Sequence, residues 1–464
     1  MDGLNLGARL DRLPWSKFHT LVAITLGIGW MLDAFQVTII GGVMGFITKQ
    51  FHVTAIQGSL AVSTWLVGIM IGAVLFGILT DYYGRKSMFI LTLLVYAAFS
   101  VLTIFAWNYD SFLSLRFLTA IGVGGEYSAV NSAIQEFIPS STRGRVGAAV
   151  DNMWSVGAVV ASLVTIFFVG ILPPTIGWRV GFGFGALVAL FVLFARRGIP
   201  ESPRWLFSKK RSQEADAVVN QIEERVKSER GLAHLPAYEA ANVKEPEKVL
   251  SFWKQMGELF AKYPGRLLLG MGLDFSEASG YYGLFTFAAV VVFPAIHLTP
   301  VESVWYYLWG GVGAVIGGIV PYLLMDKIGR RITVTSGYVM AVFAMLVVAA
   351  AASTGSQTAV LWAFMLGEAC ATWAWVSAYP TFSEAFPTHL RATGVGVSVA
   401  VGRLGAAFAP LWLASIAVHS GEGTALTYLA GFYGIGVVVM IIWSIFGVEA
   451  ANKSLEEVAP PPVM

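Results

Sequence analysis

The sequence predicts an all-α membrane protein in which twelve transmembrane helices form two pseudo-symmetric halves of six helices each. Three observations carry this prediction. The composition is too apolar for a protein surrounded by water, Lys and Arg gather in alternate loops, and two loop motifs recur at nearly the same spacing along the chain. The first indicates a bilayer, the second gives the direction of the helices, and the third indicates a duplication.

The composition places most of the chain in lipid. Hydrophobic residues make up 56% and charged residues 12% of the 464 residues, and the mean hydropathy is +0.69. Soluble proteins average about 45–50% apolar and about 25% charged residues. Of the 58 charged residues (30 basic and 28 acidic), 23 lie in the segment 196–265, which leaves 35 for the other 394 residues. A bilayer accommodates so much uncharged surface, whereas water does not.

Apolar runs of about 20 residues mark the expected helices. Six lie in the first half, residues 1–195, and six in the second half, residues 266–446. A polar linker, 196–265, joins the halves, and a tail, 447–464, follows them; its three consecutive prolines indicate disorder. The expected spans are 18–44, 57–79, 87–107, 112–136, 146–171, 179–195, 266–293, 302–325, 333–352, 358–382, 392–417 and 424–446.

The distribution of Lys and Arg predicts the orientation. By position, 26 of the 30 fall at the N-terminus, in the loops that follow even-numbered spans, in the linker or in the tail. Lys49 and Arg179 lie on the opposite side, and Arg116 and Arg403 lie within spans. The positive-inside rule therefore places both termini and the linker in the cytoplasm, in a multi-pass protein of the cell membrane. We expect it to act as a monomer in contact with the lipid bilayer.

Several classes of function lack support in the sequence. The single cysteine, Cys370, excludes a disulfide framework and a cysteine metal site. No nucleotide-binding loop follows a strand, so ATP-driven transport is unsupported, and nothing resembles a catalytic triad. We expect no enzymatic activity, no cofactor, no metal and no nucleic-acid partner.

Two motifs occur once in each half. The motif Asp-x-x-Gly-Arg-Lys/Arg begins at Asp81, after the second span, and again at Asp326, after the eighth, 245 residues later. The motif Glu-x-x-Pro-x-x-x-Arg begins at Glu136 and again at Glu384, 248 residues later. Two motifs at nearly one offset indicate that the halves arose by duplication, with a binding site where they meet near the middle of the membrane.

The same motifs put opposite charges at the cytoplasmic ends of helices. Such pairs can latch the halves together in one conformational state and separate in another. The alternative is that they only anchor the helix ends at the membrane surface. The expected gating residues are Asp81, Arg85, Lys86, Glu136, Arg143, Asp326, Arg330, Arg331, Glu384 and Arg391.

These motifs resemble those of the major facilitator superfamily, and the resemblance covers essentially the whole chain. PESPRWL at 200–206 is similar to the sugar porter and organic ion transporter branch, and GGEY at 124–127 to bacterial metabolite:proton symporters. YYGL at 281–284 and GRLGAAFAP at 402–410 resemble organic anion transporters and nicotinate-type permeases. The resemblance implies a secondary transporter that takes up a small organic anion, an aromatic or heterocyclic carboxylate, together with protons by alternating access.

Ionisable residues inside the spans are candidates for the transport chemistry, because a charge at the bilayer centre costs roughly 2.5–3.5 kcal/mol. Asp33 lies about 22 Å above the cytoplasmic start of its span, and Arg116 lies near the outer start of the fourth span, so the two can meet. In the resembling symporters an acid in the first span and an Arg in the fourth couple the proton to the substrate. We expect Asp33 and Arg116 to do so here; the alternative is a structural ion pair. Many relatives carry a second acid where Gln36 stands.

Arg403 is the expected anion-binding residue. It lies about 17 Å deep in its span, it keeps its proton, and its forked donors suit a carboxylate. The alternative is that it pairs with an internal acid, Glu277 or Glu368. Asp274, Glu277 and Tyr281 share one helical face at spacings of three and seven residues. The expected substrate-binding residues are Arg403, Glu277, Tyr281, Tyr282, Asp274, Glu126, Gln36 and Trp373.

Two other transport functions and one of another class remain open. PESPRWL is compatible with a sugar or polyol proton symporter, and the acids of the seventh span with an exporter of organic cations or drugs. A non-transporting sensor with this fold would need a larger cytoplasmic domain than the linker provides.

Overall fold

The computed structural model describes residues 5–53, 55–196, 198–238 and 252–459, and all regular structure within these ranges is helical. Twelve long helices confirm the predicted fold. The first half contains α2 (Lys17–Gln50), α3 (Ala55–Tyr83), α4 (Arg85–Ile104), α5 (Tyr109–Phe137), α6 (Arg143–Ile171) and α7 (Pro174–Arg196). The second contains α11 (Pro264–Phe287), which continues through η1 (Ala288–Val292) into α12 (Phe293–Ala295), and α13 (Pro300–Ile328), α14 (Arg330–Ser353), α15 (Gln357–Ala385), α16 (Arg391–Ser420) and α17 (Glu422–Phe446).

Local sequence signals define several helix starts. The side chain of Asn108 accepts a hydrogen bond from the backbone N–H of Ser111, and the two residues form a capping box at the start of α5. Thr299 and Glu302 form the same arrangement at the start of α13, with Pro300 at its first position. These caps satisfy backbone N–H groups that the first turn of a helix leaves without partners.

Nine helices in the described part of the chain are apolar and long enough by themselves to cross a membrane. The other three of the twelve are α7, whose apolar stretch Thr175–Leu190 is shorter, and α5 and α11, which carry charged residues in their middle. Arg116 and Glu126 of α5, and Asp274 and Glu277 of α11, are all buried. Their charges therefore face protein and not lipid, which is how a polar helix is accommodated in a membrane.

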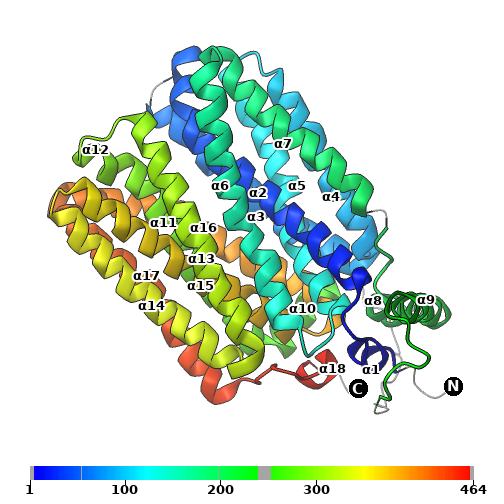
Figure 1. Cartoon of the computed structure of the whole chain (residues 1–464). Coiled ribbons are helices and arrows are strands. Elements are labelled where there is room, and N and C mark those ends of the chain that lie inside the picture. The colour runs from blue at the N-terminus through cyan, green and yellow to red at the C-terminus, as the bar shows by residue number, and fades with distance from the viewer. Residues whose placement is uncertain (1–4, 54, 197, 239–251, 460–464) are drawn as a thin grey trace.

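The two halves meet along two pairs of helices that correspond to each other. Helix α3, the second of its half, packs on α16, the fifth of the other, and α6 packs on α13 in the same way. Figure 1 shows the two bundles side by side, α2–α7 in blue to green and α11–α17 in lime to red. Glycine permits the close approach: a Cβ on Gly77 would lie 2.7 Å from the carbonyl oxygen of Ala392. Substituting Gly77 would therefore push α3 and α16 apart.

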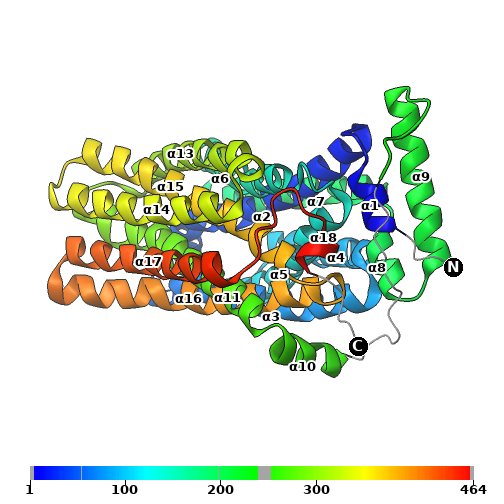
Figure 2. The ribbon, with the colours of Figure 1, turned by 90° about the horizontal axis from the view of Figure 1, so that it is seen from below.

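Both described chain ends and five short helices lie at one end of the bundle, which we call the terminal face (Figures 1 and 2). The short helices are α1 (Leu6–Asp11), α8 (Pro203–Ser208), α9 (Ser212–Arg230), α10 (Phe252–Lys262) and α18 (Leu455–Val458). Arg9 of α1 forms ion pairs of 2.6 Å with Asp216 and with Glu223 of α9, and Arg12 pairs with Glu223 at 2.7 Å. Charged contacts thus attach the N-terminal segment to the linker.

The expected disorder of the tail is wrong for residues 447–459. Both carboxylate oxygens of Glu449 accept backbone hydrogen bonds at the start of α14, from Arg330 (2.9 Å) and Arg331 (3.1 Å). Arg266 donates to the carbonyl oxygen of Val458 at 3.1 Å. The tail is ordered because it satisfies polar groups that the helix ends leave open; residues 460–464, with the three prolines, lie outside the described residues.

Candidate functional site

The repeated aspartates join the two halves at the terminal face. Asp81, at the end of α3, accepts hydrogen bonds at the start of α16 from the backbone N–H of Thr393 (2.7 Å) and from its hydroxyl (2.8 Å). Asp326, at the end of α13, accepts from the backbone N–H groups of Gly144 (3.1 Å) and Arg145 (2.9 Å) at the start of α6. Each aspartate therefore caps a helix of the opposite half, where a carboxylate is favoured.

The repeated arginines hold these aspartates in place. Arg85 pairs with Asp81 at 3.1 Å and with Glu136 at 2.7 Å. In the second half, Arg330 pairs with Asp326 at 2.8 Å and with Glu384 at 2.9 Å. All these side chains except the half-buried Asp326 are buried. A buried ion pair is costly to break by removing one partner.

Further contacts cross between the halves. Arg391 lies 3.3 Å from Glu136, and Arg85 donates to the carbonyl oxygen of Thr388 at 2.8 Å. The other motif residues bind the N-terminal segment, the tail or the linker. Arg143 pairs with Asp11 at 3.0 Å, Arg331 donates to the carbonyl oxygen of Gly447 at 2.7 Å, and the backbone N–H of Lys86 donates to Glu201 at 3.3 Å. These contacts connect the two halves and the terminal segments at the terminal face.

Sequence reasoning missed one repeated pair in this network, Glu201 and Glu449. Glu201 accepts from the backbone N–H of Arg85 at 2.9 Å, as Glu449 does from that of Arg330. The two glutamates are 248 residues apart, the same offset as Glu136 and Glu384, so the repeat spacing was the available signal. The residue before each arginine is a glycine with positive φ, 105° at Gly84 and 89° at Gly329, which leaves room for the carboxylate.

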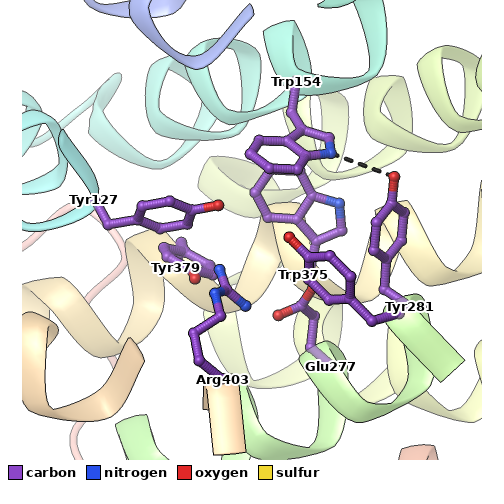
Figure 3. Close-up of a pocket in the computed structure, with 8 residues that line it drawn as sticks. Tyr127, Trp154, Glu277, Tyr281, Trp375, Tyr379 and Arg403 are labelled. Atoms are coloured by element: carbon purple, nitrogen blue, oxygen red, sulfur yellow. Dashed lines mark hydrogen bonds between the residues drawn. The ribbon is translucent and has the colours of Figure 1, made fainter. Parts of the chain in front are cut away.

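Where the halves meet inside the bundle, aromatic side chains surround a cavity that we call the Arg403 cavity (Figure 3). Its empty volume is about 250 Å³. Helices α5 and α6 of the first half contribute two lining residues, and α11, α15 and α16 of the second half contribute six. The lining residues are Tyr127, Trp154, Glu277, Tyr281, Tyr282, Trp375, Tyr379 and Arg403.

Arg403 is the buried cation of this cavity, with 3% of its surface exposed. Its guanidinium lies 4.8 Å from the ring centre of Tyr127 and 5.4 Å from that of Tyr282. Its Nε and Nη1 have no hydrogen-bond partner among the described residues. Buried donors without partners are costly, so these two N–H groups are available to a ligand that enters the cavity.

Two carboxyl groups lie near Arg403. Glu277 lines the cavity, with its carboxylate directed towards the guanidinium (Figure 3), and Asp274 is one helical turn away, packed against Gly402. Both interact electrostatically with Arg403. Within the described part of the chain, three carboxyl oxygens have no hydrogen-bond partner: both oxygens of Asp274 and Oε2 of Glu277. With both acids ionised, the cluster carries one positive and two negative charges.

The sequence led us to expect that Asp33 pairs with Arg116, but in the structure it does not. Arg116 donates to the side-chain oxygen of Gln36 at 2.6 Å and to its carbonyl oxygen at 3.1 Å, and it stacks 4.0 Å from the ring centre of Trp65. Gln36, one turn further along α2, thus stands where the acid was expected. Asp33 instead interacts electrostatically with Tyr127, at the edge of the Arg403 cavity.

Two other expected binding residues lie outside the cavity lining. Trp373 donates to the carbonyl oxygen of Thr333 in α14 at 3.2 Å, and Trp375 lines the cavity in its place. Residues two positions apart in a helix are separated by about 200° of rotation about its axis, so Trp373 and Trp375 point in different directions. Glu126 accepts a hydrogen bond from the hydroxyl of Thr92 at 2.6 Å, between α5 and α4.

Comparison with known proteins identifies the family. The family model described as "Sugar (and other) transporter" matches residues 23–460. The niacin transporter NiaP of Acinetobacter baylyi is 30% identical, over 98% of this chain and 100% of its own length. The putative niacin/nicotinamide transporter NiaP of Bacillus subtilis is 28% identical, over 85% of this chain and 87% of its own length. A structure of the proton:xylose symporter XylE with bound 6-bromo-6-deoxy-D-glucose has a TM-score of 0.77 at 18% identity, covering 95% of this chain and 98% of that one. This chain therefore belongs to the sugar (and other) transporter family, and it has the fold of the major facilitator superfamily.

Proposed function

We propose that this protein takes up a small organic anion, an aromatic or heterocyclic carboxylate, together with protons. The observation that carries the proposal is Arg403, a buried cation in a cavity between the halves, whose Nε and Nη1 have no hydrogen-bond partner among the residues that the structure describes. A guanidinium binds a carboxylate through two parallel hydrogen bonds, and the surrounding rings suit a flat apolar group. The relative named a niacin transporter agrees with this class, because niacin is a pyridine carboxylate.

The cavity favours this substrate class over the two other transport functions. For a sugar or polyol site we expect amide side chains such as paired Gln and Asn. None of the described lining residues is Asn or Gln, and the groups that both donate and accept hydrogen bonds are tyrosine hydroxyls. An organic cation would meet the fixed positive charge of Arg403 in the cavity lining, and it would be repelled whenever Asp274 and Glu277 are protonated.

Coupling to protons follows from the charges of the cluster. When Asp274 and Glu277 are both ionised, their two negative charges outweigh Arg403 and oppose an incoming anion. Each proton that binds the pair removes one negative charge, so it strengthens the attraction of the cluster for a carboxylate. Linkage makes the effect reciprocal: the bound anion raises the affinity for the proton. Asp33, which interacts with Tyr127 and Tyr282, is the corresponding proton site that we propose in the first half.

The terminal face provides the gate. The charge distribution favours a cytoplasmic terminal face, with both termini inside the cell. The present state is then closed to the cytoplasm, and release of the substrate requires that Asp81 leave Thr393 and that Asp326 leave Gly144. Alternating access of this kind rocks one half against the other around a fixed central site.

Uptake into liposomes tests the proposal. Purified protein is reconstituted, an inward proton gradient is imposed, and accumulation of labelled benzoate, pyridine-3-carboxylate, xylose and an aromatic amine is measured. We expect the gradient to drive accumulation of the carboxylates above equilibrium. Accumulation of xylose or the amine with exclusion of both carboxylates would refute the assignment.

A further inference from the structure

A second cavity adjoins the first and is not used by the mechanism above. Its empty volume is about 320 Å³, and Trp154 and Tyr281 line both cavities. We call it the Glu368 cavity after its one acidic lining residue among those described. The shared partition includes the hydrogen bond of 3.4 Å from the indole N–H of Trp154 to the hydroxyl of Tyr281, drawn in Figure 3. We expect a rotation of Tyr281 that breaks this hydrogen bond to join the two cavities.

Glu368 is a buried carboxyl group whose bonding is incomplete. It is 4% exposed, and its Oε1 has no hydrogen-bond partner in the described ranges. The nearby hydroxyl of Tyr307 donates to the carbonyl oxygen of Phe285 at 2.8 Å and is thus already committed. The hydroxyl oxygens of Ser155 and Thr372, which line the same cavity, also lack partners among the described residues. A buried acid in this position needs a proton or a donor from a ligand.

The rest of the lining suits an aromatic ring. Phe285, Tyr307 and Phe364 line the cavity together with the two shared aromatic residues. The hydroxyl of Tyr281 interacts electrostatically with both Glu277 and Glu368, so it stands between the acids of the two cavities. If Tyr281 rotates away and the aromatic ring of a substrate takes its place in the partition, that ring has Arg403 on one side and Glu368 on the other.

We propose that Glu368 binds a basic nitrogen on the same substrate whose carboxylate Arg403 binds, so the preferred substrates are aromatic carboxylates with a ring nitrogen or an amine. A carboxyl group and a basic nitrogen with one proton between them form a hydrogen bond in two ways. Either the protonated carboxyl group donates to the nitrogen, or the protonated nitrogen donates to the carboxylate. This inference rests on the proposed function and adds the second recognition group. A site built to bind a polar group rejects an analogue that lacks it, because its buried groups then stay unpaired.

Binding of matched ligands to the purified full-length protein tests this. The dissociation constants of benzoate, pyridine-3-carboxylate and 4-(aminomethyl)benzoate are measured for the wild type and for Glu368→Gln. We expect at least one nitrogen-containing ligand to bind about tenfold or more tightly than benzoate to the wild type. Glu368→Gln should remove most of this preference and leave benzoate affinity within about twofold, which also shows that the variant is folded.

Two results would overturn the inference. The wild type could bind all three ligands equally, or Glu368→Gln could keep the preference. If that variant keeps the preference and also loses proton-driven accumulation, Glu368 is a proton carrier only. Glu422→Gln, the same acid-to-amide change at the start of α17 and outside both cavities, is the matched control, and it should keep the preference. Failure of the wild type to bind any carboxylate would instead contradict the proposed function, so the two failures are distinguishable.

Discussion

Asp81 of the first half caps the first turn of α16 in the second half by accepting from Thr393 at 2.7 Å. Asp326 caps α6 in the reverse direction. The two contacts are related by the internal duplication, and in the gating that we propose both break before the terminal face opens. The proposed gate thus consists of two helix caps, each held by a buried arginine of its own half.

Removing one cap should open the terminal face more often. Replacing an N-cap aspartate by alanine costs about 0.5–2 kcal/mol, so Asp81→Ala should raise the population of the open state about two- to thirtyfold. Hydrogen exchange of the protein in nanodiscs should be faster in the first turn of α16. Thr393→Val is the control, since it keeps the backbone N–H, and its effect should be smaller. Unchanged exchange in Asp81→Ala would show that the cap does not hold the gate.

Glu201 and Glu449 should differ in their pH dependence although their positions are equivalent. Burial raises the pKa of Glu449, but hydrogen bonds from the backbone N–H groups of Arg330 and Arg331 lower it, and their effect outweighs that of burial. The pKa of Glu449 therefore lies below its usual value. Its charge stabilises the fold above the unfolded pKa of about 4.3, and this contribution disappears as the pH falls through the folded pKa. Glu449→Gln should therefore lower the melting temperature at pH 7 and have less effect near pH 4.

Glu201 provides the matched comparison. Burial raises its pKa above the usual value, in spite of the N–H groups that it accepts from. Protonated Glu201 therefore stabilises the folded state, and this stabilisation is lost as the pH rises through the raised pKa. At pH 7 Glu201→Gln should thus reduce the melting temperature less than Glu449→Gln does. Thermal unfolding in detergent at pH 4, 5.5 and 7 gives the comparison; equal losses at every pH would contradict it.

Neutralising the acids beside Arg403 should separate binding from coupling. In Asp274→Asn combined with Glu277→Gln the cluster keeps its cation and loses two competing negative charges. We expect carboxylate binding at pH 8 at least about tenfold tighter than in the wild type and nearly independent of pH. Counterflow exchange should persist while proton-driven accumulation is lost. Binding that still weakens from pH 6 to pH 8 would place the coupling group elsewhere.

Asp33 gives the corresponding test in the first half. Asp33→Asn should keep exchange and lose accumulation if its proton is part of the transport cycle. Gln36→Ala is a useful companion because it removes the side-chain acceptor that Arg116 has in this state. Full accumulation in Asp33→Asn would assign coupling to the second half alone.

The fold was predictable from the sequence because apolar runs mark the segments that cross the bilayer and the positions of Lys and Arg give their direction. The residues that we propose as the gate could be selected from the sequence as well, since Asp81 and Asp326 sit in motifs whose spacing reveals the duplication. Glu201 and Glu449 follow the same spacing, but neither lies in a motif that recurs in the other half, so the repeat was overlooked.

The cavity was only partly predictable. Asp274 and Glu277 could be placed beside each other because helical spacing is local. Which tryptophan of α15 faces inward depends on how that helix is rotated in the bundle, and Trp375 does so instead of Trp373. Whether Arg116 meets Asp33 or Gln36 depends on how α2 and α5 slide along each other, a property of packing that no single helix encodes.

The dissociation constant of benzoate for Arg403→Ala and Arg403→Lys tests the central claim most directly. Truncating one partner of a buried charge pair costs about 2–5 kcal/mol, so Arg403→Ala should bind benzoate about 30-fold to several thousandfold more weakly than the wild type. Arg403→Lys should recover part of the affinity, because it keeps the charge and loses the forked geometry. Wild-type affinity in a folded Arg403→Ala variant would contradict the account.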